Sequence, residues 1–494
     1  MKFIVFLSQQ FCAVSIFSSA EAREVHDDSA TPFETPSCTH RRLLPATLAA
    51  AFLLLLAGPV GAQAQTATVN WANVHQTIQG FGAYNAWAPL GSYQSLLFNT
   101  LGYSLLRASL PTDDSCSSGP SSDCGSGVSN TSDMQYCVAH GCKVWASVSS
   151  PPADMKTNGS TSCTVVGATL LPGDYGAYAT YISNYIASLA TYFNIPLYGI
   201  SPQNEPDTCF NGTQTEAFSA MSSANLDTFI KTNLGPTLAA KGQSSTLIMM
   251  PETGSYGDLS TYAGTCMADS NCSSYVGITA FHDYDNASSP TNPYSTAQFW
   301  ETETSGPPGP SLCSGCWDPS IADALMWAKI VHTNLVNGVT AWHYFWYVDP
   351  TGSNENSGLI NPAMSTPISI RTYAIAQWAK FVRPGWVRID ATVNPVSGVD
   401  VTAFKNPSTS EFAIVAVNEN ASSSDVDFSL TGFTPTAVTP YVTSATLSVS
   451  PQSNVPVSDD SFTYTLSNQS ITTFVGSTLT PSAPTNLTAK VVAQ

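Results

Sequence analysis

Short apolar runs of strand length alternate with longer amphipathic segments through the middle of the chain. The strand-like runs are Ile78–Ala83, Ser104–Leu110, Lys143–Val148, Leu197–Gln203, Thr246–Pro251, Tyr275–His282, Ala297–Glu303 and Val339–Trp346. Apolar runs of this kind are typical of strands buried in a parallel sheet. Repeated βα units predict an α/β protein, a (β/α)8 TIM barrel, over residues 78–383.

Two of the intervening segments carry clear helix signals. The first has apolar and aromatic side chains at helical spacing: Tyr178, Tyr181, Ile182, Tyr185, Ile186 and Leu189. The second is expected to begin at Asp318-Pro319, an N-cap followed by proline, and to stop at Asn337-Gly338. A doubly wound open sheet is the alternative fold. It would need a glycine-rich phosphate loop after the first strand, but Gly80-Phe81-Gly82 lacks the third glycine and the later acid.

The pattern changes at about residue 384. Short alternating runs separated by Pro, Asn, Ser and Gly predict an antiparallel β-sandwich side domain over 384–478. The runs are Gly385–Asp390, Val399–Phe404, Phe412–Val417, Val426–Leu430, Tyr441–Ser444, Thr446–Val449, Phe462–Leu466 and Ile471–Val475. Residues 65–77, which include the β-like Thr66–Trp71, are expected to add a strand to it. The Pro- and Thr-rich end, 479–494, is interpreted as a linker or the start of a truncated module.

The first 64 residues have the features of an export signal. Arg41-Arg42 precede the apolar run Leu43–Val60, and Ala62-Gln63-Ala64 forms a small-x-small cleavage site. We therefore treat 1–64 as a leader with a signal peptide and expect a secreted protein.

Composition narrows the class of partner. Charged residues are only 10% of the 494, the formal net charge is −18 and the sequence pI is about 4.5. This balance disfavours nucleic acid and anionic membranes, which attract basic surfaces. A neutral, hydroxyl-rich partner such as a polysaccharide fits better, and we expect a monomer.

Ten of the twelve cysteines lie after the leader, an even number that suggests disulfides in an oxidising compartment. Close spacing suggests the local pairs Cys116/Cys124, Cys137/Cys142, Cys266/Cys272 and Cys313/Cys316. Cys163 and Cys209 are left over and could pair with each other across the barrel mouth, but spacing alone does not determine the connectivity. Zinc at Cys313-Ser-Gly-Cys316 is disfavoured, because no second Cys/His pair has matching spacing.

Two glutamates carry the functional prediction. Glu205 and Glu303 follow apolar strands, and residues at the C-terminal ends of barrel strands converge on one mouth. Cleavage of a glycosidic bond needs one carboxylic acid that protonates the leaving oxygen and one carboxylate that attacks the anomeric carbon. The expected binding residues at the same mouth are Trp87, Arg107, Trp145, Asn204, His282, Tyr284 and Trp346.

Each of these residues also has a purely structural interpretation. Glu205, which precedes Pro206, would serve equally well as a carboxylate at a helix start. Arg107 would pair with Asp113 or Asp114, while His282, Trp145 and Trp346 would belong to the core. Glu301 faces the same side as Glu303 but deeper in the barrel, and Glu252 at the end of the fifth strand is a third candidate carboxylate.

The chain resembles glycoside hydrolase family 30, a family of retaining barrel glycosidases. The matching motifs are Gln79–Ala83, Leu105-Leu106-Arg107, Ser149-Ser150-Pro151-Pro152-Ala153, Met155-Lys156-Thr157-Asn158-Gly159, Ser201-Pro202-Gln203-Asn204-Glu205-Pro206 and Glu301-Thr302-Glu303. The resemblance implies that Glu205 is the general acid/base, that Glu303 is the nucleophile and that Asn204 holds the sugar 2-hydroxyl. It also implies carboxyl groups about 5–5.5 Å apart. Since the two acids carry out the chemistry, we expect no metal or organic cofactor.

The resemblance leaves the substrate open. Members that recognise glucuronate branches on xylan use an arginine after the eighth strand, but the loop Val348–Ile360 contains no Arg or Lys. We therefore expect a secreted endo-β-1,4-xylanase without strict dependence on glucuronate. An endo-β-1,6-glucanase or galactanase and a non-catalytic carbohydrate-binding protein are the alternatives.

Overall fold

The structure, a computed structural model, describes residues 65–478 apart from internal gaps at 86, 127–129, 210–213, 295–297 and 307–314. The predicted leader (1–64) and the predicted tail (479–494) lie outside the described residues. Over the described part of the chain, no helix has the length and apolarity needed to span a bilayer.

Eight parallel strands form a closed barrel. Their order follows the chain, and β11 pairs with both β2 and β10, which closes the sheet. The strands are β2 (Gly80–Tyr84), β3 (Leu105–Leu110), β4 (Lys143–Val148), β6 (Leu197–Ser201), β8 (Leu247–Thr253), β9 (Val276–His282), β10 (Gln298–Glu303) and β11 (Ala341–Val348). Every predicted barrel strand overlaps one of these, so the predicted TIM barrel is confirmed. The short strand β12 (Gly358–Ile360) pairs with β11 outside the ring.

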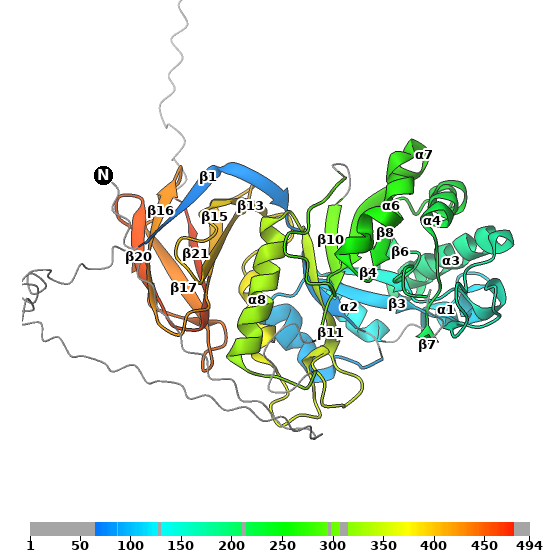
Figure 1. Ribbon diagram of the computed structural model, residues 1–494, viewed down its shortest axis with the longest axis horizontal. Helices are drawn as coiled ribbons and strands as arrows, with labels where there is room; N and C mark the ends of the chain where they lie inside the picture. Colours follow the sequence, from blue (N-terminus) through cyan, green and yellow to red (C-terminus); the bar gives the residue numbers. More distant parts are fainter. Residues whose placement is uncertain are drawn as a thin grey trace, which may run out of the picture. The chain divides into compact units, whose positions relative to one another are not determined.

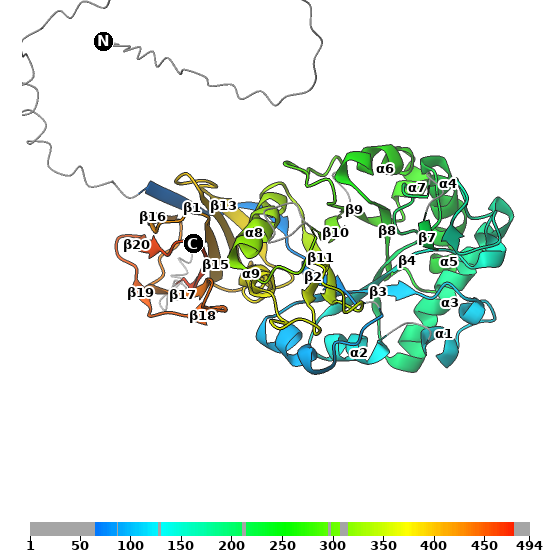
Figure 2. The same ribbon diagram turned by 60° about the horizontal axis from the view of Figure 1, so that its bottom comes forward.

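Helices lie around the outside of the barrel strands (Figure 2). They are α1 (Ser122–Ser126), α2 (Thr131–Ala139), α3 (Tyr175–Phe193), α4 (Ser223–Phe229), α5 (Gly235–Ala240), α6 (Leu259–Ala268), α7 (Ser270–Ser273), α8 (Ile321–Val336) and α9 (Ile370–Ala379). The predicted aromatic helix is α3, which buries Tyr178, Tyr185 and Leu189. A π-helical turn, Ile230–Leu234, joins helices α4 and α5.

Helix α8 begins two residues later than predicted. Its N-cap is Ser320, whose hydroxyl accepts a hydrogen bond from the Asp323 backbone N–H at 3.3 Å. Asp318 is buried instead, and its carbonyl oxygen accepts from Arg371 at 2.8 Å. The predicted end is confirmed, since Gly338 follows the helix with a φ of 100°.

The side domain is one curled sheet built from both ends of the described chain. Its strands are β1 (Gln65–Thr77), β13 (Val387–Ala391), β14 (Val399–Lys405), β15 (Glu411–Asn418), β16 (Ser424–Thr431), β17 (Ala437–Thr443), β18 (Ser450–Pro451), β19 (Val455–Pro456), β20 (Ser461–Leu466) and β21 (Ser470–Ser477). Most neighbours are antiparallel, as predicted, but β1 runs parallel to β16 beside antiparallel β13 (Figure 1). The predicted strand Thr446–Val449 is wrong: these residues form bends, and Val449 has a φ of 49°.

Helices α8 and α9 join the barrel to the side domain. Helix α8 packs against β14, and α9 packs against β17 and β21. The indole N–H of Trp378 on α9 donates to the Thr402 hydroxyl on β14 at 3.1 Å. One apolar core therefore continues from the barrel into this face of the side sheet.

Disulfides confirm four of the predicted cysteine pairs. Three are the local pairs Cys116–Cys124, Cys137–Cys142 and Cys266–Cys272. The fourth, Cys163–Cys209, joins the loop after β4 to the loop after β6, where β5 (Ser162–Cys163) pairs with β7 (Gln214–Ala217). Cys316 is disulfide-bonded, but Cys313 lies outside the described residues, so their pairing stays a prediction.

Candidate active site

A cavity of about 560 Å³ lies at the C-terminal ends of the barrel strands. This is the end of a TIM barrel at which catalytic groups gather. The cavity is lined by Tyr84, Trp87, Arg107, Ser149, Asn204, Glu205, Phe218, Tyr284, Glu303, Phe345, Trp346, Pro350 and Thr351. Both predicted catalytic glutamates are among these residues.

The two glutamates face each other across the floor of the cavity. A carboxylate oxygen of Glu205, a ring nitrogen of His282 and a carboxylate oxygen of Glu303 all lie within 4.8 Å of one another. Glu303 ends β10, and Glu205 lies four residues beyond β6. Two strands that are far apart in the sequence thus bring the two acids close enough to reach the same bond of a substrate.

Arg107 on β3 connects the acids of the site. It is 1% exposed, and its guanidinium group bonds to the Glu303 carboxylate and to the Asn204 side-chain oxygen. It also pairs with Glu252 at 2.8 Å. The alternative pairing of Arg107 with Asp113 or Asp114 is therefore wrong.

His282 at the end of β9 contacts three carboxylates. Its Nδ1 lies 2.9 Å from Glu205, and its Nε2 lies 3.5 Å from Glu252 and 3.8 Å from Glu303. Burial alone would lower the pKa of His282, but the Glu303 charge and the hydrogen bonds to Glu205 and Glu252 raise it to about 10. The imidazole is therefore a cation at neutral pH.

Glu303 is held as an anion. Burial alone would raise its pKa, but the charges of His282 and Arg107 and the hydrogen bonds from Arg107 and Tyr284 lower it below the ordinary value. The Tyr284 hydroxyl donates to the other carboxylate oxygen at 2.8 Å. An ionised carboxylate whose two oxygens are both held by hydrogen bonds is suited to attack an electrophilic carbon.

The backbone at Glu205 is held in an uncommon conformation. Glu205 has a φ of 42°, and its N–H donates to the carbonyl oxygen of Glu252, which has a φ of 58°. Left-handed conformations at residues other than glycine cost free energy and cluster at functional sites. Residues 206–209 form turns rather than a helix, so the interpretation of Glu205 as a helix-start carboxylate is wrong.

Aromatic side chains form one wall of the cavity. Trp87 is 66% exposed, and its ring meets those of Trp346 and Tyr84 edge to face, with centroids 5.9 Å apart in both pairs. Phe345 stacks on Trp346 at 4.2 Å. Flat apolar faces at an open cavity are suited to packing against sugar rings.

Two predicted binding residues do not reach the cavity. Trp145 and His282 are both fully buried. The indole N–H of Trp145 donates to His343 at 3.0 Å, and its ring lies under the Arg107 guanidinium group at 5.3 Å. The two residues support groups that line the cavity, and substrate would not touch them directly.

Several lining residues were not predicted from the sequence. Tyr84 ends β2, and Ser149 directly follows β4, so the strand-end rule would have included both. Phe218, Pro350 and Thr351 lie on loops, and Phe345 lies on β11 with its neighbour Trp346. No pattern in the sequence singles out these loop positions.

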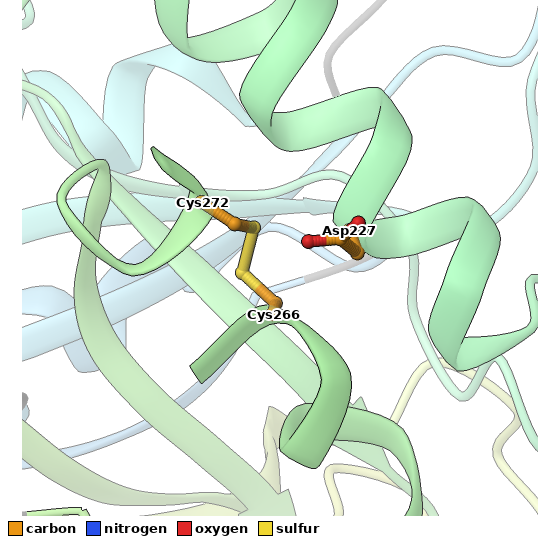
Figure 3. Close-up of side chains that lie close together, drawn as sticks. All are labelled: Asp227, Cys266 and Cys272. Atoms are coloured by element: carbon orange, nitrogen blue, oxygen red, sulfur yellow. A yellow bond between two sulfur atoms is a disulfide. The ribbon is translucent and has the colours of Figure 1, made fainter. Parts of the chain in front are cut away.

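Two clusters of metal-ligating groups occur among the described residues. One is Glu205, His282 and Glu303, whose atoms already bond to one another and to Arg107. The other is Asp227 with Cys266 and Cys272, but the two sulfurs are bonded to each other (Figure 3) and offer no thiolate. The expectation that the chemistry needs no metal stays a prediction.

Comparisons with known proteins agree with this geometry. Residues 131–356 match the model of the glycosyl hydrolase family 30 TIM-barrel domain, and residues 385–474 match that of the glycosyl hydrolase family 30 beta sandwich domain. The chain is 28% identical over 432 residues to glucuronoxylanase XynC of Bacillus subtilis (strain 168), covering 83% of this chain and 92% of XynC.

Two solved structures with the same architecture are described as xylanases. The glycoside hydrolase family 30 subfamily 8 xylanase Xyn30A from Clostridium acetobutylicum gives a TM-score of 0.72 at 27% identity, covering 83% of this chain and 99% of that one. A GH30 endoxylanase from Clostridium papyrosolvens C71 gives 0.70 at 27% identity, covering 83% and 100%.

Proposed function

Because the chain belongs to glycoside hydrolase family 30 and is therefore a glycoside hydrolase, we propose that it is a secreted, retaining endo-β-1,4-xylanase. Glu205 is its general acid/base and Glu303 its nucleophile. The observation that carries this assignment is the pair of Glu205 and Glu303 oxygens within 4.8 Å. Retaining enzymes hold their carboxyl groups about 5–5.5 Å apart, whereas inverting enzymes need about 6.5–9.5 Å to admit a water.

In the first step, the Glu303 carboxylate attacks the anomeric carbon and forms a glycosyl ester. The bond from that carbon to the glycosidic oxygen breaks, and Glu205 gives its proton to the departing oxygen, which leaves as an alcohol. Arg107 and Tyr284 hold the attacking carboxylate in place. Asn204, which lines the cavity beside both acids, binds the sugar 2-hydroxyl.

In the second step, the Glu205 carboxylate accepts a proton from water. The resulting hydroxide attacks the anomeric carbon, and the ester bond to Glu303 breaks. Two inversions give net retention. His282 stays bonded to Glu205 and stabilises the carboxylate that Glu205 becomes between the steps.

Xylan is favoured by the comparisons and by the charge of the cavity. The similar proteins include a glucuronoxylanase and two xylanases, and an endo-β-1,6-glucanase is among the structural neighbours. Among the described residues, Arg107 is the one cation that lines the cavity, and Glu252 and Glu303 already neutralise it. Since no further cation is available for a glucuronate branch, cleavage should not require one.

Export is supported by the signal-like sequence of the leader and by the disulfides. Disulfides persist in oxidising compartments and are rare in the cytosol. Cleavage of a polymer too large to enter a cell requires an enzyme outside it.

The test is to incubate the mature protein with unbranched β-1,4-xylan, glucuronoxylan, β-1,6-glucan and β-1,6-galactan and to size the products. We expect xylo-oligosaccharides of several lengths from both xylans, with the β-anomer appearing first by NMR. Release of monosaccharide alone would contradict the endo assignment. Activity restricted to glucuronoxylan would contradict the proposal that cleavage does not require a glucuronate branch. Activity restricted to a β-1,6-glycan would show that the substrate is that glycan and not xylan.

A further inference from the structure

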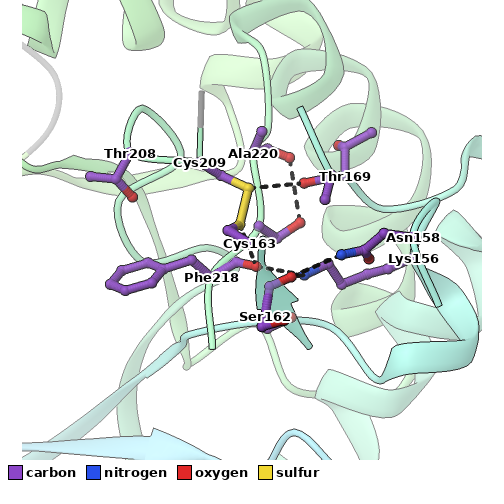
Figure 4. Close-up of a disulfide and its surroundings, with 12 residues drawn as sticks. Lys156, Asn158, Ser162, Cys163, Thr169, Thr208, Cys209, Phe218 and Ala220 are labelled. Atoms are coloured by element: carbon purple, nitrogen blue, oxygen red, sulfur yellow. Dashed lines mark hydrogen bonds between the residues drawn. A yellow bond between two sulfur atoms is a disulfide. The ribbon is translucent and has the colours of Figure 1, made fainter. Parts of the chain in front are cut away.

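One loop beside the cavity contains a sequence motif that the chemistry above does not use. The motif Met155–Gly159 lies in the loop after β4, which faces the loop after β6. Strands β5 and β7 pair across the two loops, and the Cys163–Cys209 disulfide cross-links them (Figure 4). We call residues 155–170 together with the described residues 206–209 and 214–221 the loop pair.

Lys156 lies inside the loop pair and is only 3% exposed. Its ammonium group donates to the backbone carbonyls of Thr161 and Ser162 at 2.9 and 3.3 Å. It also donates to the carbonyl of Phe218 at 2.5 Å, from the opposite loop. Burial lowers the pKa of Lys156 to about 8, so the group remains protonated at neutral pH. Three carbonyls use all three donors of the ammonium group.

The loop pair holds Phe218 from both sides. The Phe218 N–H donates to the Thr161 carbonyl at 3.2 Å, while the Phe218 carbonyl accepts from Lys156. The Phe218 side chain packs against an apolar cluster that contains both cysteines of the disulfide. The Phe218 side chain also lines the cavity that holds Glu205 and Glu303. Lys156 does not line this cavity.

The disulfide also connects the loop pair to the turn that follows Glu205. Thr208 directly precedes Cys209, and its N–H and hydroxyl both donate to the Glu205 carbonyl, at 3.2 and 3.0 Å. The disulfide therefore lies between the segment that positions Phe218 and the turn that follows Glu205.

We propose that Lys156 is a positioning residue for substrate: it fixes Phe218 as a wall of the cavity, against which the apolar face of a bound sugar ring packs. Lys156 acts through Phe218 and does not touch the substrate. The proposal rests on the function proposed above, because it takes a glycan as the occupant of the cavity.

The test is a double-mutant cycle of Lys156→Met and Phe218→Ala on the β-glycan that the wild-type enzyme cleaves fastest. Each single variant should raise KM about three- to tenfold, the range for loss of one aromatic contact, with kcat little changed. The double variant should match Phe218→Ala alone, because the effect of Lys156 passes through that ring. An unchanged KM in Lys156→Met, or effects on KM that multiply in the double variant, would overturn the proposal.

A second variant keeps the proposal testable if Lys156→Met does not fold. Cys163→Ala/Cys209→Ala loosens the same loop pair and should show the same loss of additivity with Phe218→Ala. The matched control is Cys137→Ala/Cys142→Ala, a disulfide at the start of β4 and therefore at the other end of the barrel. The control should lower Tm without changing KM, and a KM change as large as that of the Cys163/Cys209 variant would contradict the proposal. A wild-type enzyme that cleaves a different β-glycan corrects the proposed substrate, and the cycle on that glycan still tests Lys156.

Discussion

Two groups of buried side chains around the end of β10 treat ionisable residues in opposite ways. The first, at the cavity, consists of Arg107, Glu252, His282 and Glu303. The second consists of Glu301 and His343, whose backbone N–H donates to the Glu301 carboxyl group. Both acids on β10 are buried, with exposed fractions of 6% for Glu303 and 0% for Glu301. Although they lie two residues apart, the pKa of Glu303 is lowered and that of Glu301 is raised.

Cations decide the difference. Glu303 has Arg107 and His282 beside it, which hold its pKa below the ordinary value despite burial. Burial raises the pKa of Glu301 well above the ordinary value. The backbone N–H of His343 donates to the Glu301 carboxyl group at 2.8 Å, and this hydrogen bond only partly offsets the rise in pKa. The histidines follow the same rule: the pKa of His282 rises to about 10, whereas burial lowers that of His343 to about 3. Burial alone therefore does not mark the catalytic acid.

The largest expected effect is the loss of activity in Glu303→Gln. Removing the attacking carboxylate should lower kcat at least about 10⁴-fold on the best substrate of the panel. The matched control is Glu301→Gln, which replaces a buried acid on the same strand that does not line the cavity. We expect its kcat to stay within about threefold of wild type. Equal losses in both variants would contradict the difference between the two carboxyl groups.

The second effect is the loss of proton transfer in Glu205→Gln. We expect kcat on xylan to fall about 10²–10⁴-fold, because the glycosidic oxygen leaves poorly without a proton. A substrate whose leaving group needs no protonation should lose much less in the first step. The measurement compares xylan with an aryl glycoside of low leaving-group pKa, and equal losses on both would argue against an acid role.

The third effect is a shift of the pH profile in Arg107→Met. Loss of this cation should raise the pKa of Glu303, so activity disappears at a higher pH as the solution is acidified. We expect the acid limb of the kcat/KM profile to move upward by at least about one pH unit, the smallest shift usual for a carboxylate that loses a cationic partner. A lower kcat with an unmoved acid limb would show that Arg107 does not control the ionisation.

The smallest effect concerns stability. The pKa of His282 is raised on folding. Its contribution to the free energy of unfolding is therefore fully present below about pH 6.5 and is lost as pH rises toward 10. The pKa of His343 is lowered, so folding is favoured above about pH 6.5 and this contribution is lost as pH falls toward 3. Plots of Tm against pH should flatten on the alkaline side in His282→Gln and on the acidic side in His343→Gln. Flattening on the same side in both variants would contradict the opposite signs.

Periodicity in the sequence predicted the barrel because each strand is a short apolar run with a polar residue at its end. The same rule brought Arg107, Glu205 and Glu303 to one cavity. It misplaced Trp145, because alternation gives the side to which a residue points and not its depth in the barrel. Trp145 points into the barrel, but it lies under the Arg107 guanidinium group and does not line the cavity.

Features set by tertiary contacts escaped prediction. Asp318 looked like an N-cap, yet Arg371 binds its carbonyl oxygen and Ser320 caps α8 instead. Phe218 lines the cavity because a disulfide and a buried lysine from distant positions hold its loop. Neither contact is visible in the residues next to Phe218 in the sequence.

The most direct test of the central claim is to trap the glycosyl-enzyme ester with a 2-deoxy-2-fluoro-xylobioside and to identify the labelled residue by peptide mass spectrometry. We expect a single adduct on Glu303, the carboxylate that Arg107 and His282 keep ionised. An adduct on Glu205, Glu252 or Glu301, or hydrolysis with inversion and no adduct, would contradict it.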